Sequence, residues 1–298
     1  MKRFIRWLRV NLDAVVVMIV ALTAAAVEMF GTFGGDDKYV PSATLVVLAL
    51  LAISILRDRA ALSRAVRDTA TVRQLYGAEI GQTHALARGA TDQWAFKGGT
   101  GSYLRAVTLP ELLDKARHER RSLRVQLEIL DPANEAVCRD DAHFRASLQP
   151  ANTGRPWTAD RVRKQAYGTV LAAWWYHQQS EFLEIDLAVS PIRTTYRWDL
   201  SAGCVIVTQG NANTPALLFE SDKPHYRDLA RELRMSFRQA KRVPIDLHSD
   251  LSTPGEPTLR QTRELFDRLG MPLPGVYTDD DVAEIIRHAL RPEAAPHW

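Results

Sequence analysis

Two long apolar runs lie close together at the start of this 298-residue sequence. Residues 14–35 contain Glu28 as their only ionisable side chain, and a helix of that length would extend about 33 Å, enough to cross a bilayer. Residues 39–56 carry no charged side chain and reach about the minimum spanning length. Since three residues separate the runs, the pattern predicts an antiparallel two-helix transmembrane hairpin within residues 1–56.

Basic residues flank this hairpin on its outer sides and predict its orientation. Four precede the first run and four follow the second: Lys2, Arg3, Arg6, Arg9, Arg57, Arg59, Arg64 and Arg67. By the positive-inside rule both termini are expected in the cytoplasm, as in a multi-pass protein of the inner membrane. The alternative is a secretory signal peptide cleaved after Ala24–Ala26, but the basic stretch after the second run favours the hairpin.

Glu28 is the unusual residue of the predicted hairpin, because a carboxylate inside a span generally faces other helices or water. Gly31 and Gly35 form a G-x-x-x-G pattern that permits close helix contact. These residues indicate a seam of a homo-oligomer within the lipid bilayer. The alternative is that Glu28 lies near the outer interface and extends into water.

The overall composition conceals this division of the chain. The sequence is 46% hydrophobic and 24% charged, with a formal net charge of +3 and a mean hydropathy of −0.20, which describes an ordinary globular chain. A pI near 8.9 is only mildly basic, so no specific nucleic-acid partner is predicted. Two cysteines, Cys138 and Cys204, are too few for a disulfide framework or a thiolate zinc site. We expect no metal and no cofactor.

Behind the hairpin, the pattern predicts three further regions. Residues 57–90 lack proline and read as a helical stalk that continues from the second span, with a coiled coil and a helix packed on the globular domain as the alternatives. Residues 91–242 alternate between strand and helix patterns and predict an α/β domain. Residues 243–298 read as a linker and a C-terminal helical appendage. The expected fold class is therefore an α/β cytosolic domain preceded by a transmembrane hairpin and a helical stalk.

Within the α/β region, some strands and helices are indicated more clearly by the sequence than others. Residues 122–130 alternate cleanly between apolar and polar side chains, which is typical of a strand. The other expected strands are 92–97, 182–189, 195–200, 204–208 and 217–220, and the expected helices are 103–121, 133–148, 158–178 and 224–242.

A glycine-rich loop between a strand and a helix is the strongest candidate for binding chemistry. It consists of Lys97, Gly98, Gly99, Thr100, Gly101 and Ser102, with Arg105 in the helix that follows. Glycines let backbone N–H groups converge, and a helix start adds partial positive charge, so the arrangement suits phosphate or another anion. The spacing is neither that of a P-loop nor G-x-G-x-x-G, and a purely structural tight turn is the alternative.

A second candidate lies at the expected strand 195–200. Arg193 and Arg197 accompany Tyr196 and Trp198, and arginine beside an aromatic ring suits a base and its phosphate. Period-two alternation places Arg197 and Asp199 on one strand face, opposite Tyr196 and Trp198. The alternative is an apolar face in the core and a solvated charged face.

No catalytic residue is assigned. The eight histidines show no H-E-x-x-H motif and no metal-ligand pairing, and no G-x-S-x-G is present.

The segments WAFKGGTGSYL, LRVQLEILDP, LEIDLAVSP and TYRWDLSAGCVIVTQ follow one another within about residues 91–242. Their order resembles the phospholipase D-like fold, in which a strand leads into a Gly-rich turn, the next ends in Leu-Asp-Pro, and a hairpin carries His-x-Lys. None of the histidines here has lysine two residues later. The resemblance therefore implies a non-catalytic member that retains a phosphate-facing pocket.

A two-span hairpin joined to a cytosolic α/β domain also resembles the layout of prokaryotic antiphage membrane effectors, in which a soluble domain senses a nucleotide signal. The expected function is thus a membrane-anchored sensor or effector that binds a phosphate-bearing ligand, such as a nucleotide, and acts on the membrane. The alternatives are a membrane-tethered phosphodiester hydrolase or transferase and a non-enzymatic scaffold.

Overall fold

A computed structural model describes residues 72–148, 156–210, 214–246 and 255–291 of this chain, together with six helical positions between residues 51 and 62. The chain divides into two compact units, residues 1–70 and 71–298, and the description below concerns the second.

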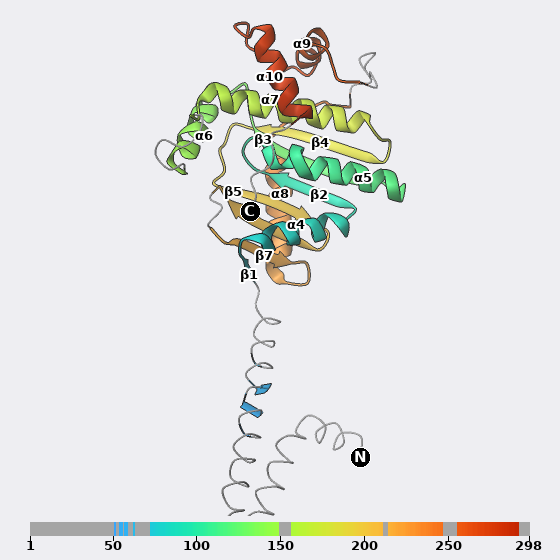
Figure 1. Ribbon diagram of the computed structural model, residues 1–298, viewed down its shortest axis with the longest axis vertical. Coiled ribbons are helices and arrows are strands. Elements are labelled where there is room, and N and C mark those ends of the chain that lie inside the picture. Colours follow the sequence, from blue (N-terminus) through green and yellow to red (C-terminus); the bar gives the residue numbers. More distant parts are fainter. Residues whose placement is uncertain are drawn as a thin grey trace, which may run out of the picture. The chain divides into compact units, whose positions relative to one another are not determined.

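Within the described residues, eight strands form one mixed sheet (Figure 1). Its spatial order is β1-β7-β6-β5-β2-β3-β4-β8, with β2, β3 and β4 parallel to one another. The strands are β1 (Arg73–Leu75), β2 (Gln93–Lys97), β3 (Leu123–Leu130), β4 (Leu183–Ser190), β5 (Tyr196–Ser201), β6 (Cys204–Gln209), β7 (Ala216–Glu220) and β8 (Lys241–Val243). Because β5 runs antiparallel to β2, it begins at the edge where the parallel strands end.

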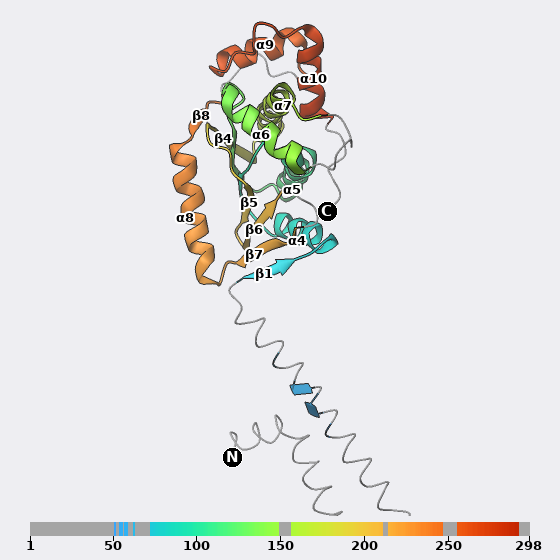
Figure 2. The ribbon, with the colours of Figure 1, turned by 90° about the vertical axis from the view of Figure 1, so that its left-hand side faces the viewer.

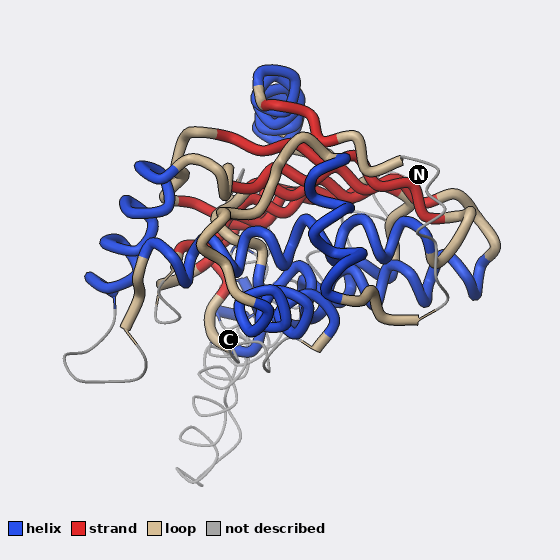
Figure 3. Tube along the Cα trace, turned by 90° about the horizontal axis from the view of Figure 1, so that it is seen from above, coloured by secondary structure: helices blue, strands red, loops and turns tan. Residues whose placement is uncertain are grey.

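Helices cover both faces of the sheet unequally (Figures 2 and 3). Among the described helices, α8 (Pro224–Gln239) alone covers one face. The other carries α4 (Ala78–Gly89), a π-helical turn η1 (Leu104–Thr108) continuing into α5 (Leu109–Glu119), α6 (Glu135–Leu148) and α7 (Ala159–Gln178). Outside α7 lie α9 (Leu259–Arg268) and α10 (Asp279–Leu290), which make a further layer on this side.

The main core lies between the sheet and α7. In β3 the apolar side chains of Leu123, Val125, Leu127 and Ile129 are all at most 2% exposed, as their alternation predicts. Helix α7 is buried on most of its circumference because α10 packs against its outer side. At Gly168 a Cβ atom would lie only 2.9 Å from the Cβ of His288, so glycine permits this close approach.

The predicted fold class requires a correction where it placed a transmembrane hairpin ahead of the α/β domain. Among the described residues no helix is both long and apolar enough to span a membrane. The longest of them, α7, carries four charged side chains near its start: Asp160, Arg161, Arg163 and Lys164. Most of the residues expected to form the hairpin, including Glu28, Gly31 and Gly35, lie outside the described residues; of that segment only Leu51, Ser54 and Ile55 are described, and they are helical.

The expected helical stalk 57–90 is interrupted by a strand, although its last part, Ala78–Gly89, is helical as expected. Residues Arg73–Leu75 form β1, which pairs antiparallel with β7, before α4 begins at Ala78. Leu75 is fully buried against Ile206 and Leu218. The burial of this side chain and the hydrogen bonds of β1 with β7 favour a strand where the sequence pattern predicted a helix. Gly77 connects strand and helix with a φ of +49°, a conformation that favours glycine.

Candidate functional site

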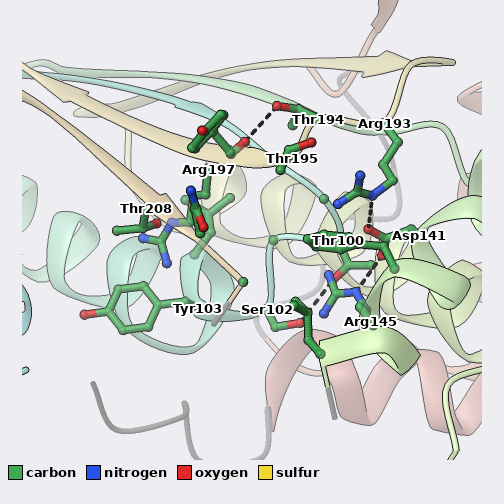
Figure 4. Close-up of a pocket in the computed structure, with 18 of the residues that line it drawn as sticks. Thr100, Ser102, Tyr103, Asp141, Arg145, Arg193, Thr194, Thr195, Arg197 and Thr208 are labelled. Atoms are coloured by element: carbon green, nitrogen blue, oxygen red, sulfur yellow. Dashed lines mark hydrogen bonds and ion pairs between the residues drawn. The ribbon is translucent and has the colours of Figure 1, made fainter. Parts of the chain in front are cut away.

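A pocket of about 420 Å³ opens at the edge of the sheet where β2 and β3 end. Four segments far apart in the sequence build most of its wall: the loop after β2, helix α6 after β3, the segment leading into β5, and the end of β6 (Figure 4). The crevice at the carboxyl ends of parallel strands is the usual ligand site of such sheets. The volume is suited to a small molecule of nucleotide size.

The glycine-rich loop forms one side of the pocket, with Gly99, Thr100, Gly101 and Ser102 in its lining. Gly101 has a φ of +72°, and a Cβ there would lie 2.9 Å from the side chain of Thr169. At Gly99 a Cβ would face the Arg145 guanidinium at 3.1 Å and Asp141 at 3.4 Å. The loop therefore needs glycine both for its backbone conformation and to let the charged groups of α6 approach.

Asp141 and Arg145 of α6 form the charged centre of the pocket. The Arg145 Nε donates to Asp141 Oδ2 at 2.6 Å, and its Nη2 donates to Thr100 Oγ1 at 3.1 Å. Asp141 is almost fully buried, and its other oxygen lies 3.6 Å from Arg193 Nε. A single carboxylate thus stands between two guanidinium groups from different parts of the chain.

Arg193 approaches this centre from the segment between β4 and β5 (Figure 4). Its guanidinium carbon lies 3.4 Å from the centre of the Phe144 ring. Nε faces Asp141 Oδ1 at 3.6 Å, longer than a hydrogen bond, whereas the buried Nη2 has no acceptor among the described residues. Burial lowers the pKa of Arg193; Asp141 opposes this shift and Arg145 adds to it. The Nη2 group is therefore left for an acceptor that the described residues do not supply.

Arg197 forms the opposite side of the pocket with Tyr103 and Thr208. Its Nε donates to Asp199 Oδ2 at 2.6 Å, and its guanidinium carbon lies 4.5 Å from the centre of the Tyr103 ring. Asp199 is 1% exposed, so the charged face of β5 is buried rather than solvated. Thr208 is 2% exposed, and its hydroxyl has no hydrogen-bond partner among the described residues.

Three of the residues predicted to bind an anion lie outside the pocket lining: Lys97, Gly98 and Arg105. The Lys97 ammonium donates to Ser236 Oγ of α8 at 2.5 Å and lies 3.5 Å from Glu128 Oε1, away from the pocket. Arg105 is 2% exposed and donates to three backbone carbonyls, those of Thr100, Gln165 and His288. Gly98 is packed against the Phe96 ring, where a Cβ would lie 2.7 Å from the ring edge. The remaining predicted residues, Gly99–Ser102, Arg193 and Arg197, all line the pocket.

Sequence reasoning missed the contribution of α6. Asp141 and Arg145 are four residues apart on a helix, which by itself reads as an ordinary surface ion pair. Their signal was positional: α6 follows β3, and because β2 and β3 are parallel neighbours, the segments that follow them lie side by side. The second half of α6 thereby reaches the Gly-rich loop.

The pocket combines groups that suit an organic anion. Three guanidinium groups, of Arg145, Arg193 and Arg197, face two carboxylates, of Asp141 and Asp199, which leaves a net charge of +1. Hydroxyl groups of Thr100, Ser102, Thr194, Thr195 and Thr208 and rings of Phe96, Tyr103, Phe144, Trp157 and Tyr196 complete the lining. Among the described residues no cluster of side chains suits a metal ion.

The fold and this pocket define a mixed α/β domain with a polar cavity at the carboxyl edge of its parallel strands. No family model matches the sequence. No curated protein matches it either. Among solved structures the chain is similar to TrmBL2, an archaeal chromatin protein, with 7% identity over 70% of this chain and 69% of that one. The TM-score of 0.32 is too low to indicate a shared fold.

Proposed function

We propose that this domain binds a small phosphate-bearing ligand, of the nucleotide class, in the pocket at the carboxyl edge of β2 and β3. The observation that carries the proposal is Arg193, which lines the pocket and whose buried Nη2 has no hydrogen-bond acceptor among the described residues. Buried polar groups are almost always hydrogen-bonded, so such an orphaned group is explained if a ligand completes the site. Guanidinium groups match phosphate oxygens in geometry as well as in charge.

The neighbouring groups support the same ligand class. Asp141 contacts both Arg145 and Arg193, and Arg145 in turn donates to Thr100. The loop that contains Thr100 brings its backbone close to the cavity. On the other side, the Tyr103 ring and the unpaired hydroxyl of Thr208 offer an aromatic surface and a hydrogen bond, as a nucleobase requires. Because the described part of the lining contains no histidine, lysine or cysteine, the proposal is for binding.

Titration calorimetry tests this proposal with the full-length chain. The probes are pyrophosphate and the common ribonucleoside mono- and triphosphates. We expect at least one probe to bind and Arg193→Gln to weaken that binding about tenfold or more, because a hydrogen bond to a charged group contributes about 1.5–3 kcal/mol.

The matched control is Arg268→Gln, which removes the same charge from α9, where the arginine pairs with Glu264 at 3.1 Å. This control should leave binding unchanged. A second variant, Gly99→Val, should abolish binding by pressing on Arg145 and Asp141. Absence of binding by every probe, or equal affinities of Arg193→Gln and the parent chain, would refute the proposal.

A further inference from the structure

Helix α8 lies on the face of the sheet opposite α4, α5 and α7 (Figure 2). A stripe of four arginines runs along its exposed side. The stripe consists of Arg227, Arg231, Arg234 and Arg238, all of them exposed. At 100° per residue these positions fall within about 60° of one another around the helix axis, over a length of about 16 Å. The guanidinium groups therefore form a narrow straight line of positive charge.

The described residues do little to neutralise this line. Arg231 lies 3.3 Å from Asp228, whereas Arg227, Arg234 and Arg238 have no carboxylate within 4.0 Å among the described residues. Within the helix, Arg227 and Arg231 are four residues apart, as are Arg234 and Arg238, and like charges at that spacing repel each other. An arrangement that destabilises its own helix is explained if an anionic partner removes the repulsion.

The shape of the charged surface indicates what kind of anion fits. The two acidic residues of α8, Asp228 and Glu232, lie about 100–140° around the helix from Arg227. A broad anionic surface, such as a membrane, would meet this acidic flank as well as the stripe. The apolar side of α8, with Ala230, Leu233 and Phe237, is buried against the protein and is not available for insertion into lipid.

We propose that the stripe of α8 binds the phosphate backbone of a duplex nucleic acid without sequence selectivity. A duplex is a stiff linear polyanion with regularly spaced phosphates, which complements a straight line of four arginines. Contacts with phosphates carry no sequence information, so binding through the stripe should not depend on the base sequence of the duplex. The proposal is independent of the pocket and of its ligand.

The dependence of binding on salt measures these contacts directly. The probe is a fluorescein-labelled DNA duplex of mixed sequence, and its anisotropy is followed with the full-length chain between low and physiological salt. Each phosphate contact contributes about −0.9 to the slope of log K against log salt concentration. Replacing all four arginines by glutamine should therefore make the slope less steep by about 3 to 4.

The matched control removes four exposed arginines that lie apart from the stripe, Arg121, Arg260, Arg268 and Arg287. It changes the net charge equally, and its slope should stay close to that of the parent chain. In the opposite direction, Asp228→Asn with Glu232→Gln should strengthen binding. The thermal unfolding temperature of the stripe variant should be unchanged or slightly higher, because the repulsion between the arginines of α8 is removed.

Three outcomes would overturn the proposal. The first is that the duplex does not bind at low salt. The second is that the stripe variant and the control lose equal slope, which would indicate an effect of net charge alone. The third is stripe-dependent binding to phosphatidylserine vesicles without binding to the duplex, which would assign the stripe to a membrane surface.

Discussion

The imidazole of His84 is fully buried in α4, beside the rings of Trp94 and Tyr103 at centroid distances of 6.4 and 5.9 Å. Burial lowers its pKa from 6.5 to about 4, opposed by the carboxylate of Asp199 and assisted by Arg197. His84 is therefore neutral in the folded protein at pH 7. Its neutrality leaves Asp199 to balance the charge of Arg197, which positions that guanidinium at the pocket.

This lowered pKa predicts how stability depends on acidity. Between about pH 6.5 and pH 4 the unfolded chain binds a proton at His84 that the folded chain does not, so stability falls as the pH falls through this window. The total loss is on the order of 3 kcal/mol at about 1.4 kcal/mol per pKa unit. Urea unfolding of the parent chain and of His84→Phe at several pH values measures it.

The Phe variant should lack the part of the pH dependence that His84 causes. Carboxylates also titrate toward the lower end of this window, so the difference between the two proteins is the relevant quantity. Equal pH profiles of the two would show that His84 does not titrate differently on folding.

At the scale of elements, Arg105 joins three parts of the fold that sequence patterns treat separately. Its Nε donates to the carbonyl of His288 in α10 at 2.7 Å, and its Nη1 donates to the carbonyls of Gln165 in α7 and Thr100 in the pocket loop. Burial lowers its pKa to about 9, which still leaves the group cationic at neutral pH. The residue predicted to hold an anion instead supports the loop that lines the anion pocket.

Arg105→Lys should therefore destabilise the fold and loosen α10 and the loop together. A lysine presents its donors on one atom and cannot span three carbonyls, and each buried acceptor left unpaired costs about 1–3 kcal/mol. We expect a loss of about 3 kcal/mol in urea unfolding and faster amide exchange in the last turn of α10. A loss below 1 kcal/mol, with unchanged exchange, would contradict this role.

Strand β5 shows why a correct element pattern does not decide which face is buried. The alternation of Arg197 and Asp199 with Tyr196 and Trp198 is observed, yet Asp199 is 1% exposed whereas Tyr196 is 41% exposed. Helices lie on both faces of the sheet, so period two does not separate a core face from a solvent face here. Arg197 and Asp199 can be buried because each neutralises the other.

At the scale of the whole molecule, the C-terminal helices belong to the main core. Phe266 of α9 is fully buried and meets the Tyr167 ring of α7 edge-on at 5.0 Å, and Ile285 and Ala289 of α10 are in the same apolar cluster as β3. Lys164 of α7 adds contacts with Asp281 and Glu284 at 2.5 and 2.9 Å. Residues 255–291 should therefore unfold together with the sheet.

Phe266→Ala tests this cooperativity. Replacing a buried phenylalanine by alanine costs about 3–5 kcal/mol of stability. The substitution loses the free energy of burying the ring and leaves a cavity in its place. We expect that loss in global unfolding and faster amide exchange in β3 as well as in α9. Faster exchange in α9 and α10 alone would show that the tail opens as a separate unit. The milder Phe266→Leu should lose less on both measures.

Local elements can be read from the amino-acid sequence: the alternation of residues 122–130, the Gly-rich loop after 92–97 and the hairpin around residues 201–203 correspond to β3, the pocket loop and β5 with β6. These features depend on interactions between near neighbours in the chain. Three further features follow only from long-range packing: Arg193 meets Asp141, Arg105 turns away from the pocket, and residues 73–75 form a strand. Those outcomes depend on strand pairing across long stretches of chain, which no local pattern records.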